Sequence, residues 1–299
     1  MERRRIGSLE VSVVGLGCNN FGWRIDKQAT KAVVAAALDN GINFLDTADM
    51  YDTGKSEEYL AEALRGRRNE VVLATKFGFS MGEGKSGASP AYVRQALDAS
   101  LLRLGTDRID LYQLHTPDPA TPIADTLGAL NDLKKAGKIR EIGCSNFSAE
   151  QLREAKGFAS VQNEYSLFHR APEADVLPEC KRSGIAFIPY FPLANGLLTG
   201  KYRKGQPLPE SSRGKDAFGP SVFTDRNLEV VESLLRFAAL HRHSLLELAI
   251  SWLAAQDTIA SVIAGARTPE QAKTNAAAAA WQLTKAELTE VDEIVLQAA

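Results

Sequence analysis

The 299-residue sequence predicts a (β/α)8 barrel of the TIM type, with a small N-terminal β-hairpin and an extra C-terminal helix. Short β-branched apolar runs alternate with longer amphipathic stretches, which indicates a parallel sheet with helices outside it. The chain holds eight such runs, and eight fit a closed barrel better than an open sheet. No Gly-x-Gly-x-x-Gly motif opens a helix after the first run, which disfavours an open dinucleotide-binding sheet.

The strands are expected where apolar runs are short and rich in Val, Ile and Leu. In chain order they are Val13–Gly17, Ile42–Leu45, Glu70–Thr75, Arg108–Leu114, Ile139–Cys144, Ala159–Gln162, Ile185–Ile188 and Ile259–Ile263. The helices between and after them are expected at Lys27–Asn40, Ser56–Leu64, Pro90–Leu104, Pro122 to Gly137, Ala149–Lys156, Pro172–Ser183, Asn227–His241, Ser244–Gln256 and Pro269–Ala280.

Helix boundaries carry recognisable signals. Ser89-Pro90 and Thr121-Pro122 combine an N-cap residue with proline at the first helical position. Glycines that end helices, such as Gly41, Gly105 and Gly184, supply the left-handed residue that helix C-termini favour.

The ends of the chain add two further elements. Arg4 to Val13, with a turn at Gly7-Ser8, predicts a hairpin that caps the N-terminal end of the barrel, and Ala286–Leu296 predicts a terminal helix. A polar stretch rich in glycine and proline, from about Gly196 to Val222, interrupts the repeat. No linker is visible, so residues 1–299 are interpreted as one domain.

Composition excludes several classes of protein. The net charge of −2 gives no basic face for nucleic acid or an anionic membrane. Cys18, Cys144 and Cys180 are too few for a disulfide framework and lack zinc-ligand spacing, so no metal site is expected. No apolar segment suits a secretory signal or a membrane span. We expect a cytoplasmic protein that is a monomer or a weak homo-oligomer.

Reactive side chains follow three of the predicted strands. Asp46, Lys76 and His115 stand at strand ends, and Tyr51 lies in the loop after Asp46. In this kind of barrel such residues converge on one mouth. Hydride transfer to a carbonyl leaves negative charge on oxygen, so a proton donor must be near. Tyr51 is the expected general acid–base, with a pKa lowered by Lys76, which Asp46 holds in place. His115 would orient the substrate oxygen.

Each of these residues has an ordinary structural interpretation when taken alone. Asp46 fits a helix N-cap, Tyr51 a core-edge aromatic, Lys76 a solvated charge and His115 a structural histidine. Their occurrence together, in order on one rim, favours catalysis.

Several motifs surround these residues. They are Phe44-Leu45-Asp46-Thr47-Ala48-Asp49-Met50-Tyr51, Gly54-x-Ser56-Glu57, Ala74-Thr75-Lys76, Asp110-Leu111-Tyr112-Gln113-Leu114-His115, Gly143-Cys144-Ser145-Asn146-Phe147 and Val161-Gln162-Asn163-Glu164-Tyr165. Together they resemble the aldo-keto reductase signature. The resemblance covers essentially the whole chain. It implies that Asp46, Tyr51, Lys76 and His115 form the catalytic tetrad of a reversible carbonyl reductase.

The resemblance also implies a nicotinamide site. Ser145, Asn146 and Gln162 would bond the carboxamide and Tyr190 would stack on the ring, although Ser145-Asn146 also fits a helix N-cap. Leu193 to Lys201 resembles the family loop that folds over the pyrophosphate, and a flexible loop without a ligand is the alternative. In this segment and just before it, the expected cofactor contacts are Phe191, Leu193, Gly196, Leu198 and Lys201.

The far end of the cofactor is expected after the last strand. Gly265, Arg267, Gln271 and Asn275 surround the start of a helix, whose free N–H groups attract phosphate. Arg267 would clamp a 2′-phosphate, and Asn275 matches a family position that contacts adenine. Many family members have basic residues in place of Gly265 and Gln271. The expected cofactor is therefore NADP(H), with some tolerance for NAD(H).

The substrate is harder to predict. Trp23 and Phe77 flank strand ends, and Phe218 and Phe223 lie in the long polar stretch, so these four are the candidate pocket walls. Core packing or a surface patch fits each of them equally well. Aromatic walls favour an aromatic or apolar carbonyl compound, although sugar-active relatives also use them.

Two other functions remain open at the level of sequence. A slow, cofactor-sensing regulatory subunit would share the same fold. A barrel isomerase or aldolase would use Lys76 as a Schiff-base amine and would need no nicotinamide.

Overall fold

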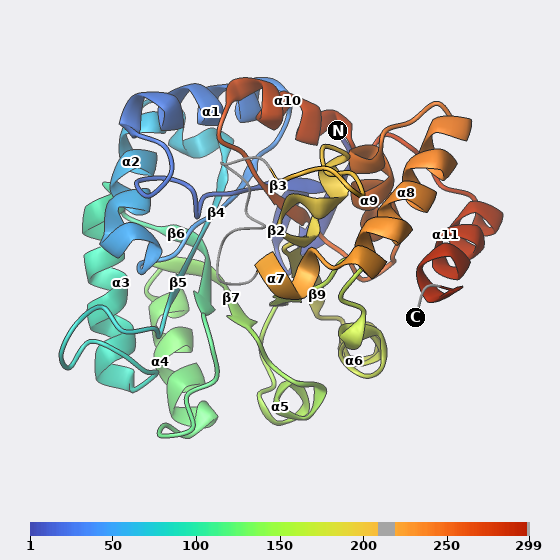
Figure 1. Cartoon of the computed structure of the whole chain (residues 1–299). Coiled ribbons are helices and arrows are strands. Elements are labelled where there is room, and N and C mark those ends of the chain that lie inside the picture. Colours follow the sequence, from blue (N-terminus) through green and yellow to red (C-terminus); the bar gives the residue numbers. More distant parts are fainter. Residues whose placement is uncertain (209–218, 298–299) are drawn as a thin grey trace.

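Eight parallel strands surround the centre of the computed structural model, which describes residues 1–208 and 219–297 (Figure 1). They are β3 (Val14–Gly17), β4 (Phe44–Asp46), β5 (Val72–Phe77), β6 (Ile109–Leu114), β7 (Ile139–Ser145), β8 (Ser160–Glu164), β9 (Ala186–Tyr190) and β10 (Val262–Gly265). The sheet runs β10-β3-β4-β5-β6-β7-β8-β9. It closes where Phe187 N–H donates to Thr258 O at 2.9 Å and Ala260 N–H donates to Phe187 O at 2.9 Å. The predicted (β/α)8 barrel is confirmed.

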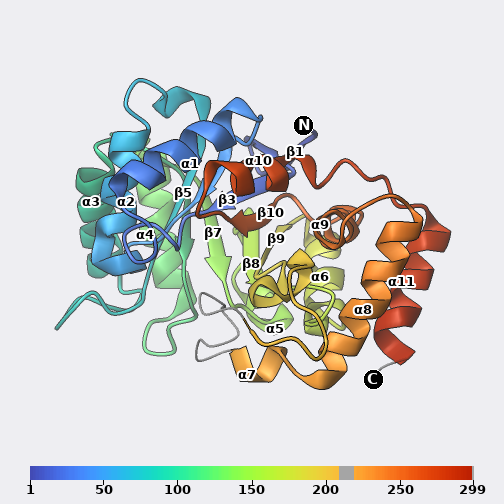
Figure 2. The same cartoon turned by 45° about the horizontal axis from the view of Figure 1, so that its top comes forward.

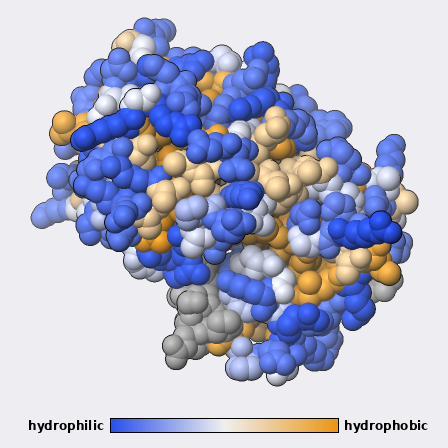
Figure 3. All heavy atoms as spheres, turned by 90° about the horizontal axis from the view of Figure 1, so that it is seen from above, coloured by the Kyte–Doolittle hydropathy of each residue, from blue (hydrophilic) through white to orange (hydrophobic). Residues whose placement is uncertain are grey.

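Helices form the outer layer. They are α1 (Lys27–Asp39), α2 (Lys55–Ala63), α3 (Pro90–Leu104), α4 (Ile123–Lys135), α5 (Ala149–Glu154), α6 (Val176–Ser183), the short α7 (Gly219–Val222), α8 (Asp225–Leu240), α9 (Leu245–Ala254), α10 (Pro269–Ala277) and the terminal α11 (Lys285–Gln297). Figure 2 shows α11 beside α8, outside the ring. On the side of α1 and α10 the surface is mostly hydrophilic, with apolar atoms in patches between the charged ones (Figure 3). The apolar stripes of the helices therefore face the barrel.

The helix signals read from the sequence agree with the caps at Ser89, Gly105 and Gly184, but helices α4 and α6 begin later than expected. Ser89 Oγ accepts from Tyr92 N–H at 3.3 Å, and Gly105 and Gly184 adopt left-handed φ values of 59° and 67°. Helix α4 begins one residue later than expected, at Ile123, because Pro122 is the N-cap and Thr121 bonds to Asp118 instead. Helix α6 starts at Val176 rather than Pro172, because Ala171–Glu173 forms a separate 3-10 turn.

The last strand was predicted too early. Ile259 and Ala260 form the irregular bridge to β9 that closes the barrel, and the regular pairing with β3 starts only at Val262. A continuous apolar run does not show where a bridge ends and a ladder begins.

A hairpin closes the N-terminal end of the barrel. Strands β1 (Arg3–Ile6) and β2 (Leu9–Ser12) pair antiparallel, and Ile6 and Leu9 are buried in one cluster with apolar side chains of the barrel interior: Phe44, Val72, Ala74, Leu111, Ile188 and Ile263. Gly7 has a φ of 55°, and a Cβ there would lie 2.7 Å from Glu141 Cδ. Ser8 N–H donates to Glu141 Oε1 at 2.8 Å, which fixes the turn against β7.

No helix among the described residues combines the length and the apolar character that crossing a lipid bilayer requires.

Candidate active site

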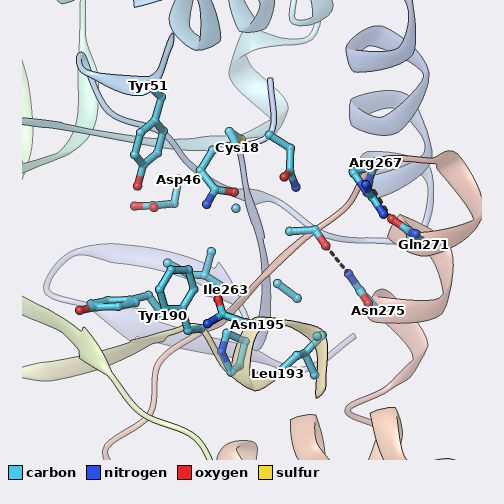
Figure 4. Close-up of a pocket in the computed structure, with 18 of the residues that line it drawn as sticks. Cys18, Asp46, Tyr51, Tyr190, Leu193, Asn195, Ile263, Arg267, Gln271 and Asn275 are labelled. Atoms are coloured by element: carbon cyan, nitrogen blue, oxygen red, sulfur yellow. Dashed lines mark hydrogen bonds between the residues drawn. The ribbon is translucent and has the colours of Figure 1, made fainter. Parts of the chain in front are cut away.

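A cavity of about 730 Å³ opens at the C-terminal ends of the strands. Its lining includes three of the four predicted catalytic residues, Asp46, Tyr51 and His115, and most of the predicted cofactor residues. Figure 4 shows Tyr51 and Asp46 at one end and Arg267, Gln271 and Asn275, on α10 and the turn before it, at the other. The volume lies within the range of small-molecule and cofactor sites.

Lys76 lies beneath the cavity floor and joins the catalytic candidates. Its side chain is completely buried, and its ammonium donates to Asp46 Oδ2 at 2.5 Å, Thr47 O at 3.0 Å and Tyr51 Oη at 3.5 Å. Side chains alternate across a strand, so the inward direction of Lys76 on β5 brings it to Asp46 on the neighbouring β4. The expected Asp46–Lys76–Tyr51 chain is therefore formed.

An unusual turn presents Tyr51. Directly after it, Asp52 and Thr53 have left-handed φ values of 46° and 55°, which cost about 1–3 kcal/mol each in non-glycine residues. Gly54 follows with a φ of 94°, and a Cβ there would lie 2.6 Å from Arg103 Cδ.

A buried ion pair holds this turn in place. Arg103 Nε donates to Glu57 Oε2 at 2.7 Å, and Thr75 Oγ1 donates to Glu57 Oε1 at 2.6 Å. The side chain of Glu57 is completely buried, so the pair ties α2 and α3 to β5 beside Lys76. Sequence reasoning quoted Glu57 only as part of a motif and missed Arg103.

The charge states of the central pair follow from competing effects. Burial lowers the pKa of Lys76, but Asp46 and Tyr51 together raise it by more than burial lowers it. The net result is a raised pKa and a charged ammonium. Burial raises the pKa of Tyr51, Lys76 lowers it and Asp46 raises it, and the net direction is upward. The expectation that Lys76 brings this pKa below its ordinary value was wrong, because desolvation outweighs an ammonium that is 3.5 Å away and shared with Asp46.

His115 is a neutral imidazole. Burial and the charge of Lys76 lower its pKa to about 2. Phe79 packs edge-to-face on its ring at 4.6 Å, and Tyr51 approaches it at 5.9 Å. Neutral imidazole keeps one N–H donor and one acceptor nitrogen, so His115 can donate one hydrogen bond to an oxygen in the cavity.

Asp49 is buried behind the site, with 1% of its surface exposed. Its Oδ1 has no hydrogen-bond partner among the described residues. Burial, reinforced by the charge of Glu57, raises its pKa from 3.8 to about 7. The folded protein therefore holds this proton more tightly than the unfolded chain does.

The sign of the effect on stability follows. Between pH 3.8 and about 7 the folded state keeps a proton that the unfolded state has lost, so rising pH destabilises the fold. We expect Asp49→Asn to raise Tm at about pH 8 and to change it little at about pH 4, with roughly 2–4 °C for each kcal/mol recovered. Differential scanning calorimetry measures this, and the exposed Asp107→Asn is the control. An equal change of Tm at both pH values would contradict it.

The predicted nicotinamide residues meet on one wall of the cavity. Asn146, which has a left-handed φ of 62°, donates to His115 O at 3.0 Å and accepts from Tyr190 Oη at 2.9 Å. Ser145 Oγ donates to Gln162 O at 2.7 Å. The side-chain nitrogen of Gln162, Nε2, donates to Asp46 Oδ1 at 3.0 Å. The side-chain oxygen of Gln162, Oε1, is then left for a ligand.

The loop after β9 forms another wall. Phe191, Leu193, Gly196 and Lys201 line the cavity, as expected, and Asn195 joins them (Figure 4). Positive φ values at Phe191, Ala194, Asn195 and Gly196 turn the backbone tightly here. Leu198 was wrongly assigned to the cofactor site, because its side chain is fully buried in the core between barrel and helices. Glycine spacing shows that a loop turns tightly but does not show which side chains face inward.

The start of α10 forms the far end of the cavity. Gly265, Arg267, Gln271 and Asn275 all line it, together with Glu270. Thr268 is the N-cap and accepts from Gln271 N–H at 3.2 Å. Gln271 Oε1 accepts from Arg267 N–H at 2.8 Å, and Asn275 Nδ2 donates to Gly265 O at 3.3 Å. Sequence reasoning gave no role to the acidic Glu270, which also lines this end of the cavity.

None of the three described candidates for the substrate walls lines the cavity. Phe77 is fully buried and stacks on Tyr112 at 4.7 Å, on the side of the sheet that faces the helices. Trp23 is 65% exposed outside the cavity lining, and Phe223 packs on Tyr202 at 4.7 Å. Phe218 lies outside the described residues. Two residues that were not expected as substrate walls, Phe79 and Met50, do line the cavity, and Phe79 packs on His115.

Comparison with known proteins bears on the whole chain. The family model described as "Aldo/keto reductase family" matches residues 13–296. The NADP(+) aldo-keto reductase yakc of Schizosaccharomyces pombe is 35% identical, with 97% of this chain and 90% of that protein covered. The NADH-specific methylglyoxal reductase of Escherichia coli is 32% identical, with 98% of each chain covered.

A solved structure agrees. The glycerol dehydrogenase of Gluconobacter oxydans superposes with a TM-score of 0.87 at 30% identity, over 99% of this chain and 96% of that one. With a family model that spans nearly all of its length and relatives that match it from end to end, this chain belongs to the aldo/keto reductase family.

Proposed function

We propose that this protein is an NADP(H)-dependent carbonyl reductase, with Tyr51 as general acid in reduction and general base in oxidation. One observation carries the proposal. A charged, fully buried lysine stands between a carboxylate and a phenol at the floor of a cavity large enough for a dinucleotide and a small substrate. Such a set both supplies a proton and stabilises the phenolate that remains.

The residues of the cavity suit a nicotinamide dinucleotide. Gln162 offers its side-chain oxygen, and Asn146 its side-chain amide, to a carboxamide beside the ring of Tyr190. The tight loop after β9 and the N-terminus of α10 suit phosphates. A Cβ at Gly265 would lie 3.0 Å from Asn20 Nδ2, and both residues line the cavity, so glycine leaves more room there than any other residue would.

When bound, the reduced nicotinamide supplies a hydride to the carbonyl carbon. His115 is neutral and donates one hydrogen bond that orients the carbonyl oxygen. Tyr51, protonated at neutral pH, delivers its proton to that oxygen as negative charge develops. Lys76 stabilises the resulting phenolate, and Asp46 fixes Lys76. Oxidation of an alcohol follows the same proton path in reverse.

The charge state of Lys76 argues against the Schiff-base alternative. An amine must be neutral to attack a carbonyl, whereas the raised pKa and the close carboxylate keep Lys76 protonated. No feature of the described residues favours the regulatory-subunit alternative over catalysis.

Two opposite charges set the preference between the two dinucleotides. Arg267 and Glu270 both line the far end of the cavity, where the guanidinium suits a 2′-phosphate and the carboxylate disfavours it. We therefore infer that NADP(H) is preferred and that NAD(H) is tolerated. The family relatives include enzymes named for each cofactor.

Replacing Arg267 with alanine is expected to weaken NADPH binding more than NADH binding. Loss of one charge-assisted contact corresponds to about 1.5–3 kcal/mol, roughly 10- to 100-fold in Kd for NADPH. Quenching of protein fluorescence measures both Kd values without turnover, and Lys273→Ala, on the same helix, is the control. Equal losses for the two cofactors would show that Arg267 does not read the 2′-phosphate.

The first test of the proposed function is direct. Purified protein is mixed with NADPH and an aromatic aldehyde, and loss of the reduced-nicotinamide absorbance is followed, with NADH in parallel. Oxidation of NADPH by the wild type supports the reductase. Tight binding of NADPH without oxidation by any of several aldehydes and ketones would favour the sensor alternative instead.

A further inference from the structure

A buried amide network lies at the floor of the cavity, between side chains of β4, β6 and β8. Gln113 Nε2 and Gln162 Nε2 each donate to Asp46 Oδ1 at 3.0 Å. Gln162 Nε2 also approaches Gln113 Oε1 at 3.4 Å. At most 3% of each of the three residues is exposed. Because an ionised carboxylate only accepts hydrogen bonds, the amide ends that face Asp46 must be nitrogens.

The fold makes room for Gln113. Leu111 and Gln113 share the inward side of β6, whereas Tyr112 points outward to Phe77. A Cβ on Gly143, in the neighbouring β7, would lie 2.9 Å from Gln113 Cγ. Gly143 therefore leaves space for the polar side chain of Gln113, directly above the apolar layer that contains Leu111.

The two carboxylate oxygens of Asp46 accept hydrogen bonds from different donors. Oδ1 is occupied by the two amides, so only Oδ2 is left for Lys76. The other two donor directions of the ammonium go to Thr47 O and to Tyr51 Oη. When Gln113 is lost, only Gln162 still holds Oδ1, so the carboxylate can rotate toward Lys76 and draw the ammonium away from Tyr51.

We propose that Gln113 is a positioning residue of the reaction, which holds Asp46 in the rotation that keeps one proton of Lys76 directed at Tyr51. The proposal rests on the proposed function, because it assigns Gln113 a role in the proton transfer by Tyr51. Nothing in Gln113 need touch the substrate or the cofactor.

Two variants of similar size separate positioning from packing. Gln113→Leu removes both donor and acceptor. Gln113→Glu keeps the shape but loses the donor when it is ionised, and regains one when it is protonated. Ser160→Ala is the control, since the Ser160 hydroxyl is buried in the same interior and has no partner among the described residues.

For Gln113→Leu we expect kcat for reduction to fall by roughly 10- to 100-fold, the effect of a small misplacement in a catalytic group. Lys76 then stabilises the phenolate less, so the alkaline limb of the kcat profile moves to higher pH. For Gln113→Glu we expect activity to recover toward low pH relative to Gln113→Leu. Near-ultraviolet circular dichroism and the Kd for NADPH establish that each variant is folded.

The outcomes are distinguishable. If the wild type does not oxidise NADPH with any carbonyl compound, the proposed function fails, and with it the setting for this inference. If the wild type is active and both folded variants follow the wild-type pH profile, Gln113 is only a packing residue. A shifted profile in Gln113→Leu, absent in Ser160→Ala, supports the assignment.

Discussion

Tyr51→Phe is expected to lower kcat by about 10²–10⁴-fold while leaving the Kd for NADPH nearly unchanged. The hydroxyl of Tyr51 is the acidic group that Lys76 contacts at the cavity floor, at 3.5 Å, whereas the ring that packs near His115 is retained in phenylalanine. The variant therefore removes a proton donor and little else. Steady-state kinetics with an aromatic aldehyde and a fluorescence titration of NADPH measure the two quantities.

Tyr59→Phe, on the outward part of α2, removes the same atom away from the cavity and controls for loss of a hydroxyl. Turnover in Tyr51→Phe within a few-fold of the wild type would overturn the assignment of Tyr51. Loss of NADPH binding in parallel with kcat would instead indicate that the hydroxyl supports the cavity rather than the chemistry.

Lys76→Met is expected to abolish measurable turnover and to destabilise the fold by about 3–5 kcal/mol, because it leaves the Asp46 carboxylate buried without its counter-charge. Urea unfolding at neutral pH measures the loss of stability. The amides of Gln113 and Gln162 still reach Oδ1, so the variant retains part of the compensation for the buried charge.

The double variant Asp46→Asn with Lys76→Met provides the decisive comparison. Since it removes both charges, most of the stability should return, whereas turnover should not. If the single variant is as stable as the wild type, the buried pair contributes no net stabilisation. If the double variant recovers turnover, the pair is not part of the proton transfer.

The sequence predicted the barrel and its reactive rim because both depend on local patterns. Alternating apolar runs mark strands, and Asp46, Lys76 and His115 are polar residues at the ends of such runs. The arrangement of strands in a closed barrel then brings them together. The same logic predicted Asn146, Gln162, Tyr190 and the start of α10 at the cavity, where the structure has them.

The misplaced cavity residues share one cause, the direction of a side chain. Because neighbouring residues in a strand point to opposite faces, the inward position of Lys76 forces Phe77 outward, and this follows from alternation. Beyond the strand end the rule fails, so nothing in the pattern singled out Phe79. The burial of Leu198 could not be predicted for the same reason, because the side chains of a loop with several left-handed residues do not alternate regularly.

Gln113 shows a signal that went unused. It stands at an inward position of β6, between Leu111 and His115. A polar residue there must find a buried partner, and the inward polar residues on the other strands were already known candidates. Arg103 carried no comparable signal, because its partner Glu57 lies on another helix and one charged helix residue resembles many others.

The hairpin across the N-terminal end of the barrel has an electrostatic consequence. The catalytic charges stand on an apolar layer that Ile6, Leu9 and Phe44 seal from below. Within the described part of the chain, solvent can screen these charges only from the mouth. A ligand that fills the mouth removes that screening, so the local dielectric constant falls when reactants are in place. Both effects on Tyr51 then grow: desolvation, which raises its pKa, and the attraction of Lys76 for the phenolate, which lowers it. The barrel therefore couples occupancy of its cavity to the acidity of its own proton donor.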